Sequence, residues 1–167
     1  RKSNYLKLYP HPFLRFTKKR CQGTLKLFKT LVVAIDLKIE SKIENLHKVE
    51  ALIENICRDL QLEEDAFGNL LIAVTEAVNN AIQHGNKNNP EKTVNIQFKK
   101  EQDKLMFSIE DEGDGFDYEN LPDPTAPENI ENPSGRGVFL MKNLADGVDF
   151  QNNGKRVDLK FNLMVAI

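Results

Sequence analysis

Apolar residues recur at two different spacings along the chain, and each spacing predicts a different kind of element. Helical spacing follows Ser41 and resumes, after a short break, over residues 62–84. Gly85 comes directly after the second helical pattern, so we expect it to cap that helix. Cys57 falls on the apolar face of the first helix, where we expect a buried thiol. The predicted buried face of this first helix consists of Ile43, Leu46, Val49, Ile53, Ile56 and Leu60.

Alternation of apolar and polar residues predicts strands on both sides of the helical region in the sequence. Two of these strands, over residues 93–99 and 104–111, are separated by a short turn and are expected to pair antiparallel. Helices that share one face of a mostly antiparallel sheet predict an α+β two-layer sandwich. The other predicted elements are a strand over 24–37, a helix over 137–146, and strands over 147–150 and 156–163 joined around 152–154.

Charge is distributed unevenly, although the whole chain of 167 residues carries a formal net charge of only −2. Residues 1–29 hold nine Lys or Arg and no acid, whereas residues 30–167 hold 14 basic and 25 acidic residues, a balance of 14 − 25 = −11. An acidic body is a poor surface for duplex nucleic acid, because phosphate contacts need basic groups, so no direct nucleic-acid partner is expected. We expect one domain over 30–167.

The basic head, residues 1–29, is open to several interpretations. Its composition is typical of a disordered extension or of a segment that enters the first strand, and it also suits nucleic acid, membrane or an acidic partner. No apolar run in the chain reaches the roughly 18 residues that predict a membrane span, so no membrane attachment is expected. The two cysteines have no metal-binding spacing and suit a reducing compartment, so we expect a cytoplasmic protein.

Three polar residues stand four positions apart on the second, otherwise apolar, predicted helix. Glu76, Asn80 and His84 place a carboxylate, an amide and an imidazole on one stripe of that helix. A solvated helix edge is one interpretation of such a stripe, and a row of ligand-binding groups is the other. For His84 we expect packing at the helix end and a favourable interaction with the helix dipole.

Two glycine-containing stretches flank a long, proline-rich segment in the second half of the chain. "EDEGDGFD" (110–117) ends a predicted strand, and its glycines permit positive φ or a close approach to a ligand. "SGRGVFLMKN" (134–143) opens a predicted helix, whose free backbone N–H groups suit a phosphate. A connecting segment of this length is usually functional or disordered.

Taken in this order, the three stretches resemble the sequence boxes of the GHKL, or Bergerat-fold, ATPases. The similarity covers roughly residues 30–163. Within that superfamily, the compact size and "TEAVNNAIQHG" resemble the anti-sigma factor serine kinases of bacteria. Those proteins bind a sigma factor and phosphorylate an anti-anti-sigma partner on serine. The matching boxes are Glu76-x-x-x-Asn80, Asp111-x-Gly113-x-Gly115 and Gly135-x-Gly137.

The resemblance implies a role for each matching residue. It implies a general base for Glu76, a Mg²⁺ ligand for Asn80, and for Asp111 an acceptor of a hydrogen bond from the adenine amino group. Gly113 and Gly115 would flank the base and hinge a lid. The residues expected to close over the phosphates of ATP are Ser134, Gly135, Arg136 and Gly137, although Arg136 could reach a partner instead.

The resemblance also implies partners: a sigma factor, an anti-anti-sigma protein of the STAS type, and a second copy of the chain. The implied activity is transfer of phosphate from ATP to a protein serine. The alternative is an ATP-gated module that sequesters a partner and transfers little or no phosphate. One departure from the pattern concerns the turn "GKRV" (154–157), where many relatives carry a Thr pair that supports the adenine-binding Asp.

Overall fold

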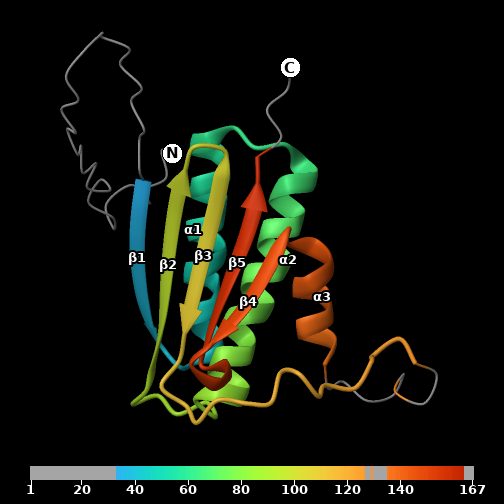
Figure 1. Ribbon diagram of the computed structural model, residues 1–167. Coiled ribbons are helices and arrows are strands. Elements are labelled where there is room, and N and C mark those ends of the chain that lie inside the picture. Colours follow the sequence, from blue (N-terminus) through green and yellow to red (C-terminus); the bar gives the residue numbers. More distant parts are fainter. Residues whose placement is uncertain (1–32, 127–128, 130–134, 164–167) are drawn as a thin grey trace, which may run out of the picture.

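The computed structural model describes residues 33–126, 129 and 135–163, which form a sheet with helices on one face (Figure 1). The five strands are all antiparallel and follow the order β1-β2-β3-β5-β4. The predicted α+β two-layer sandwich is therefore confirmed. Its elements are β1 (Val33–Glu40), α1 (Leu46–Leu60), α2 (Glu64–Asn80), β2 (Thr93–Glu101), β3 (Lys104–Glu110), α3 (Arg136–Leu144), β4 (Gly147–Gln151) and β5 (Arg156–Asn162).

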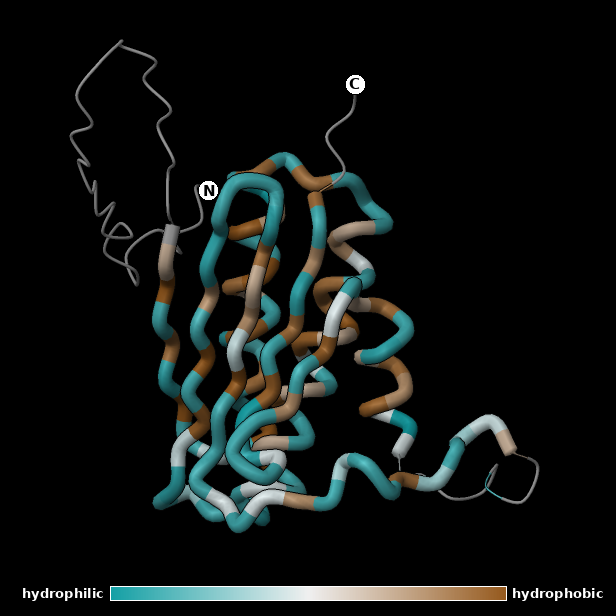
Figure 2. Tube along the Cα trace, in the orientation of Figure 1, coloured by the Kyte–Doolittle hydropathy of each residue, from teal (hydrophilic) through white to brown (hydrophobic). Residues whose placement is uncertain are grey.

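The hydrophobic core lies between the sheet and α1 and α2. Hydrophobic and hydrophilic residues alternate along the strands in the tube coloured by hydropathy (Figure 2), and Val94, Ile96 and Phe98 of β2 are buried. Phe98 on β2 lies opposite Phe107 on β3, with ring centroids 4.9 Å apart. The predicted hairpin of β2 and β3 is confirmed, and so is the hairpin of β4 and β5. Cys57 is buried as predicted, and burial raises the pKa of its thiol.

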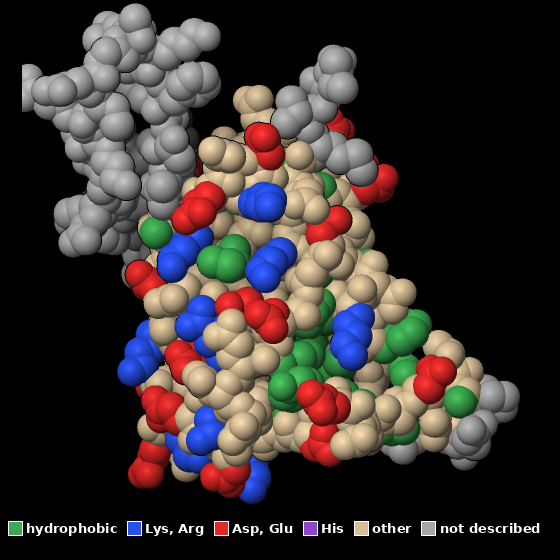
Figure 3. Space-filling view, viewed as in Figure 1, with side chains coloured by type: hydrophobic (Ala, Val, Ile, Leu, Met, Phe, Trp, Pro, Cys, Tyr) green, Lys and Arg blue, Asp and Glu red, His purple; other side chains and the backbone are tan. Residues whose placement is uncertain are grey.

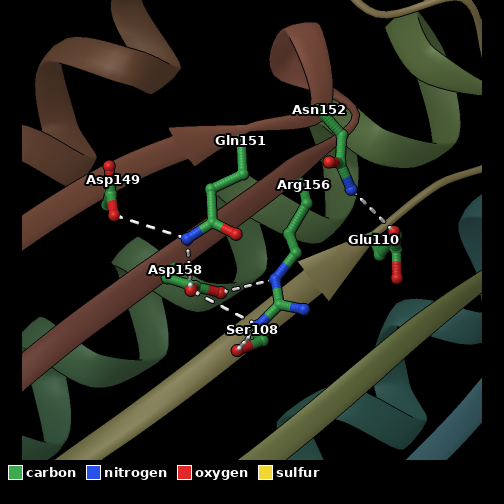
Figure 4. A network of polar contacts seen from close by, with 7 residues as sticks. All are labelled: Ser108, Glu110, Asp149, Gln151, Asn152, Arg156 and Asp158. Atoms are coloured by element: carbon green, nitrogen blue, oxygen red, sulfur yellow. Dashed lines mark hydrogen bonds and ion pairs between the residues drawn. The ribbon is translucent and has the colours of Figure 1, made fainter.

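The other face of the sheet is polar, and no helix of the described residues covers it. Lysine, arginine and acidic side chains are interspersed over it in the space-filling view (Figure 3). At its centre, Arg156 donates to the buried Asp158 carboxylate at 2.9 Å and to the Ser108 hydroxyl at 3.1 Å (Figure 4). The hydrogen bond to Asp158 raises the pKa of Arg156. This network satisfies the buried polar groups of β3 and β5 without helix cover.

Three details of the predicted elements are wrong. Ile43 was expected on the buried face of the first helix, yet it is 41% exposed, because the chain there forms a 3₁₀ turn before α1 begins. Gly85 does not cap α2, since α2 passes into a π-helical turn, Ala81–Gly85, and the Asn86 N–H donates to the Ala81 carbonyl at 2.8 Å. β1 ends at Glu40 rather than at Leu37.

Part of what the sequence predicts lies outside the described residues. This applies to the basic head 1–29, to the first part of the expected strand over 24–37, and to Ser134. Within the described ranges, no helix combines the length and the apolar character that crossing a membrane requires.

Candidate functional site

A cavity of about 390 Å³ opens at the end of the sheet where α2 stops and α3 starts. Four segments that are far apart in the sequence enclose it: the end of α2, the loop after β3, the start of α3 and the turn between β4 and β5 (Figure 1). Its lining includes both apolar and polar groups, as is usual for a small-molecule site. The lining residues that the sequence analysis singled out are Asn80, His84, Gly85, Asp111, Gly115, Gly135 and Gly137.

The loop after β3 lies directly against the π-helical end of α2. A Cβ atom placed on Gly85 would lie 2.4 Å from Asp111 Oδ2, and one placed on Gly113 would lie 2.1 Å from the Gly85 carbonyl oxygen. A side chain on Gly113 would require the Gly85 backbone to move, and one on Gly85 would displace the Asp111 carboxylate. The two glycines therefore permit the contact that brings Asp111 to the cavity.

Asp111 is half-buried and has a defined orientation. Its Oδ1 accepts a hydrogen bond from the Gly113 N–H at 2.7 Å, and its own N–H donates to the Lys155 carbonyl at 3.0 Å. Burial raises the pKa of this carboxyl, whereas the Gly113 N–H and the positive charges of Lys155 and Lys92 oppose that rise. The structure thus holds an acceptor carboxylate in a partly desolvated wall of the cavity.

Asn86 supports this site from outside the cavity lining, and the sequence analysis missed it. Its side chain is 1% exposed and donates to the Ser41 hydroxyl at 2.7 Å and to the Thr93 carbonyl at 2.9 Å. Its Oδ1 accepts from the Glu112 N–H at 2.8 Å. One amide thereby ties β1, β2 and the loop after β3 to the end of α2. Its position in a polar turn sequence gives no sign of this burial.

The turn between β4 and β5 fixes the same loop from the opposite side. The Phe116 N–H donates to the Asn153 carbonyl at 3.0 Å. Gly115 and Gly154 both have positive φ, 84° and 83°, and a Cβ on Gly115 would lie 2.0 Å from the Asn153 carbonyl oxygen. The loop and the turn therefore interlock through backbone that only glycine allows.

Glu76 and Asn80 meet at the first turn of α3. A Cβ placed on Gly137 would lie 2.9 Å from Glu76 Oε2 and 3.0 Å from Asn80 Nδ2. Asn80 lines the cavity, and the half-buried Glu76 lies immediately beside it. Within the described ranges, neither side chain has a hydrogen-bond partner. The predicted stripe therefore presents a carboxylate and an amide to the start of α3 rather than a merely solvated edge.

The start of α3 lines the cavity with Gly135 and Gly137, and the first turn of a helix leaves backbone N–H groups without partners inside the helix. Gly135 takes φ = 82° at the N-cap, and a Cβ there would lie 2.7 Å from the Pro122 carbonyl oxygen. Arg136 is exposed in the first turn. His84 also lines the cavity but is exposed, so the packing expected for it at the helix end is wrong.

Three aromatic rings form the rim of the cavity beside β4, and the sequence analysis did not single them out. Tyr118 stacks on Phe150 with centroids 4.8 Å apart, and Phe116 meets Phe150 edge to face at 5.6 Å. Phe116 remains 36% exposed and lines the cavity together with Phe150. These rings attach the start of the long connecting segment to the edge of the sheet. Hydrophobic side chains gather near this edge in Figure 3.

The residues present fit a divalent ion held mainly by a phosphate ligand. The described part of the chain contains no group of three acidic, His or Cys side chains that could hold a metal ion by themselves. Asn80 instead offers one unpaired amide oxygen, and the neighbouring Gly137 leaves its approach free of a side chain. Mg²⁺ is often held by one or two protein oxygens together with substrate phosphates.

Comparison with known proteins identifies the family that this fold and cavity represent. The histidine kinase-like ATPase domain matches residues 39–161. The chain belongs to this family and, within it, to the group of RsbW serine-protein kinases, which confirms the resemblance drawn from the sequence boxes.

Two bacterial relatives illustrate the match. Serine-protein kinase RsbW of Bacillus subtilis is 30% identical over 142 residues, covering 74% of this chain and 89% of the relative. Its namesake from Oceanobacillus iheyensis is 28% identical over 124 residues, covering 71% of this chain and 78% of the relative.

A solved structure shares the fold. It contains the RsbU and RsbW domains of a Mycobacterium tuberculosis protein and aligns with a TM-score of 0.58 at 13% sequence identity. The alignment covers 78% of this chain and 32% of that longer chain. At this identity the similarity concerns the fold alone.

Replacing Asn86 by Ala should destabilise the fold and weaken the cavity, since it removes the partner of the buried Ser41 hydroxyl and of the part-buried Glu112 N–H. We expect the free energy of unfolding to fall by about 3 kcal/mol, since each unsatisfied buried group costs roughly 1–3 kcal/mol. Urea denaturation measures this loss. Asn69→Ala, at an exposed position of α2, is the matched control and should change stability by less than about 0.5 kcal/mol. Equal effects of the two substitutions would contradict the role of Asn86.

Proposed function

We propose that this protein is an ATP-dependent serine kinase of the anti-sigma class, which transfers the γ-phosphate of ATP to a serine of a partner protein. The observation that carries the proposal is the convergence of Asp111, Asn80 and the start of α3 on one cavity, with Glu76 beside it. An acceptor for a base, an oxygen ligand for a metal and free N–H groups for phosphate are what binding of ATP requires.

Asp111 binds the adenine in this proposal. An ionised carboxylate accepts only, so it suits the exocyclic amino group of adenine and opposes the O6 acceptor of guanine. Gly113 holds one carboxylate oxygen and leaves the other available. Gly113 and Gly115 let the loop pack against the backbone of Gly85 and Asn153, and this packing would hold the loop beside the base.

The phosphates extend from the base toward α3. Gly135, Arg136 and Gly137 form its N-terminal turn, where backbone N–H groups and the helix dipole favour an anion. Ser134 belongs to the same proposed phosphate-binding segment. Asn80, which lies next to Gly137, would hold Mg²⁺ through its amide oxygen. Mg²⁺ bound there would neutralise charge on the phosphate oxygens during transfer.

Glu76 is the proposed general base. Its carboxylate lies next to Asn80 and to the start of α3, so it is close to where the γ-phosphate would end. It would take the proton of the incoming serine hydroxyl as the oxygen attacks phosphorus and ADP leaves. A carboxylate without a partner among the described residues is suited to accept that proton.

The proposed partners are a sigma factor, which the protein would sequester, and a STAS-type anti-anti-sigma protein, which would supply the serine. The protein would act in the cytoplasm and form a homodimer. The alternative, an ATP-gated binding module without transfer, is disfavoured by the placement of Glu76. A binding module needs no unpaired carboxylate beside its phosphate site.

Asp111→Asn should weaken ATP binding at least tenfold, because the amide can present a donor to the donating amino group of adenine and loses the charge of the carboxylate. Isothermal titration calorimetry with Mg-ATP measures this loss. The unsubstituted protein should bind ATP more tightly than GTP. Equal affinities for ATP and GTP would contradict the assignment of Asp111.

Glu76→Ala and Asn80→Ala should separate transfer from binding. Loss of the base should lower phosphate transfer by roughly 10²–10⁴-fold while ATP still binds. Loss of Asn80 should instead weaken the Mg²⁺-dependent part of nucleotide binding. Transfer of labelled γ-phosphate to the anti-anti-sigma partner, together with calorimetry, distinguishes the two effects. A Glu76→Ala protein that transfers phosphate at the unsubstituted rate would favour a different base.

A further inference from the structure

Lys155 reaches the cavity from the turn between β4 and β5. It ends the turn between β4 and β5 and stands two residues before Val157, which is buried under the helices. It lines the cavity, and its Cγ would lie 3.4 Å from a Cβ placed on Gly115.

Lys155 is joined to Asp111 by both backbone and charge. Its carbonyl accepts the Asp111 N–H at 3.0 Å, which fixes the spacing of the two residues. Its positive charge also lowers the pKa of Asp111 against the effect of burial. Yet no carboxylate oxygen of the described residues lies within ion-pair distance, 4.0 Å, of the Lys155 ammonium group. The three donors of this half-buried cation remain available to a ligand beside Asp111.

The edge of adenine that faces Asp111 carries two neighbouring groups of opposite character, the 6-amino donor and the N1 acceptor. Asp111 can satisfy only the donor. We propose that the Lys155 ammonium group donates a hydrogen bond to N1 of adenine, so that Asp111 and Lys155 together recognise this edge. The proposal rests on the proposed binding of ATP in the cavity. Guanine presents an O6 acceptor and an N1–H donor in the same places, and so opposes both side chains.

In this proposal, Lys155 is a residue that determines specificity for the base. The turn provides no threonine hydroxyl to approach the base, since its sequence is "GKRV". A lysine is long enough to reach past Gly115, whose missing side chain leaves room along its path. Lys92, the other cation whose charge reaches Asp111, is absent from the lining of the cavity and provides a matched control.

The test compares Mg-ATP with Mg-1-deaza-ATP, in which a C–H group replaces N1, by isothermal titration calorimetry. The unsubstituted protein should bind 1-deaza-ATP about tenfold or more weakly, as expected for loss of a hydrogen bond to a charged donor. Lys155→Met should bind both nucleotides with equal affinity, close to that of the unsubstituted protein for 1-deaza-ATP. Lys155→Arg, which keeps a cationic donor, should restore part of the difference.

Lys92→Met removes a charge near Asp111 but no proposed contact, so it should keep the full preference for ATP over 1-deaza-ATP. The proposal is overturned if the unsubstituted protein binds the two nucleotides equally, or if Lys155→Met retains the preference. Failure of the unsubstituted protein to bind ATP at all would instead overturn the proposed function, and this proposal with it. Urea denaturation of each variant establishes that it is folded.

Discussion

The close approach of two backbone segments, the end of α2 and the loop after β3, is the constraint on which the cavity depends. Gly85 and Gly113 permit this contact, because a side chain on either would collide with the opposite segment. The π-helical turn positions Gly85, and Asn86 then fastens the loop through the Glu112 N–H. Asp111 faces the cavity because its neighbours on both sides are held. A single steric requirement thus couples the fold to the site.

The cavity has two sides with different physical character. The side formed by Asp111 and the turn between β4 and β5 is fixed by hydrogen bonds, those of Asn86 among them, and by interlocked glycines. On the other side, the start of α3 meets Glu76 and Asn80 across Gly137. These two side chains have no hydrogen-bond partners among the described residues. Rigid groups suit recognition of a base, which must be selective. Unpaired groups suit phosphate, metal and the incoming serine, which arrive and leave during transfer.

The sequence predicted the two-layer architecture and the chemical groups of the site, because helical and strand periodicities are local and the boxes have fixed spacing. It could not predict Asn86 or the aromatic rim of Phe116, Tyr118 and Phe150, because these depend on contacts between distant segments. Gly85 was misassigned for the same reason: its small size serves a contact with Asp111 rather than a helix cap. Ile43 fits the helical period, but the helical segment begins there with a 3₁₀ turn rather than with α1.

The glycine amide signals in a ¹⁵N–¹H correlation spectrum test the central claim, that this junction is an adenine-nucleotide site, most directly. Titration with Mg²⁺ and a non-hydrolysable ATP analogue should shift the signals of Gly85, Gly113 and Gly115, which surround Asp111. It should leave those of Gly68 and Gly147, which lie outside the cavity lining, in place. Shifts confined to Gly68 and Gly147, or no saturable shift at all, would contradict the account.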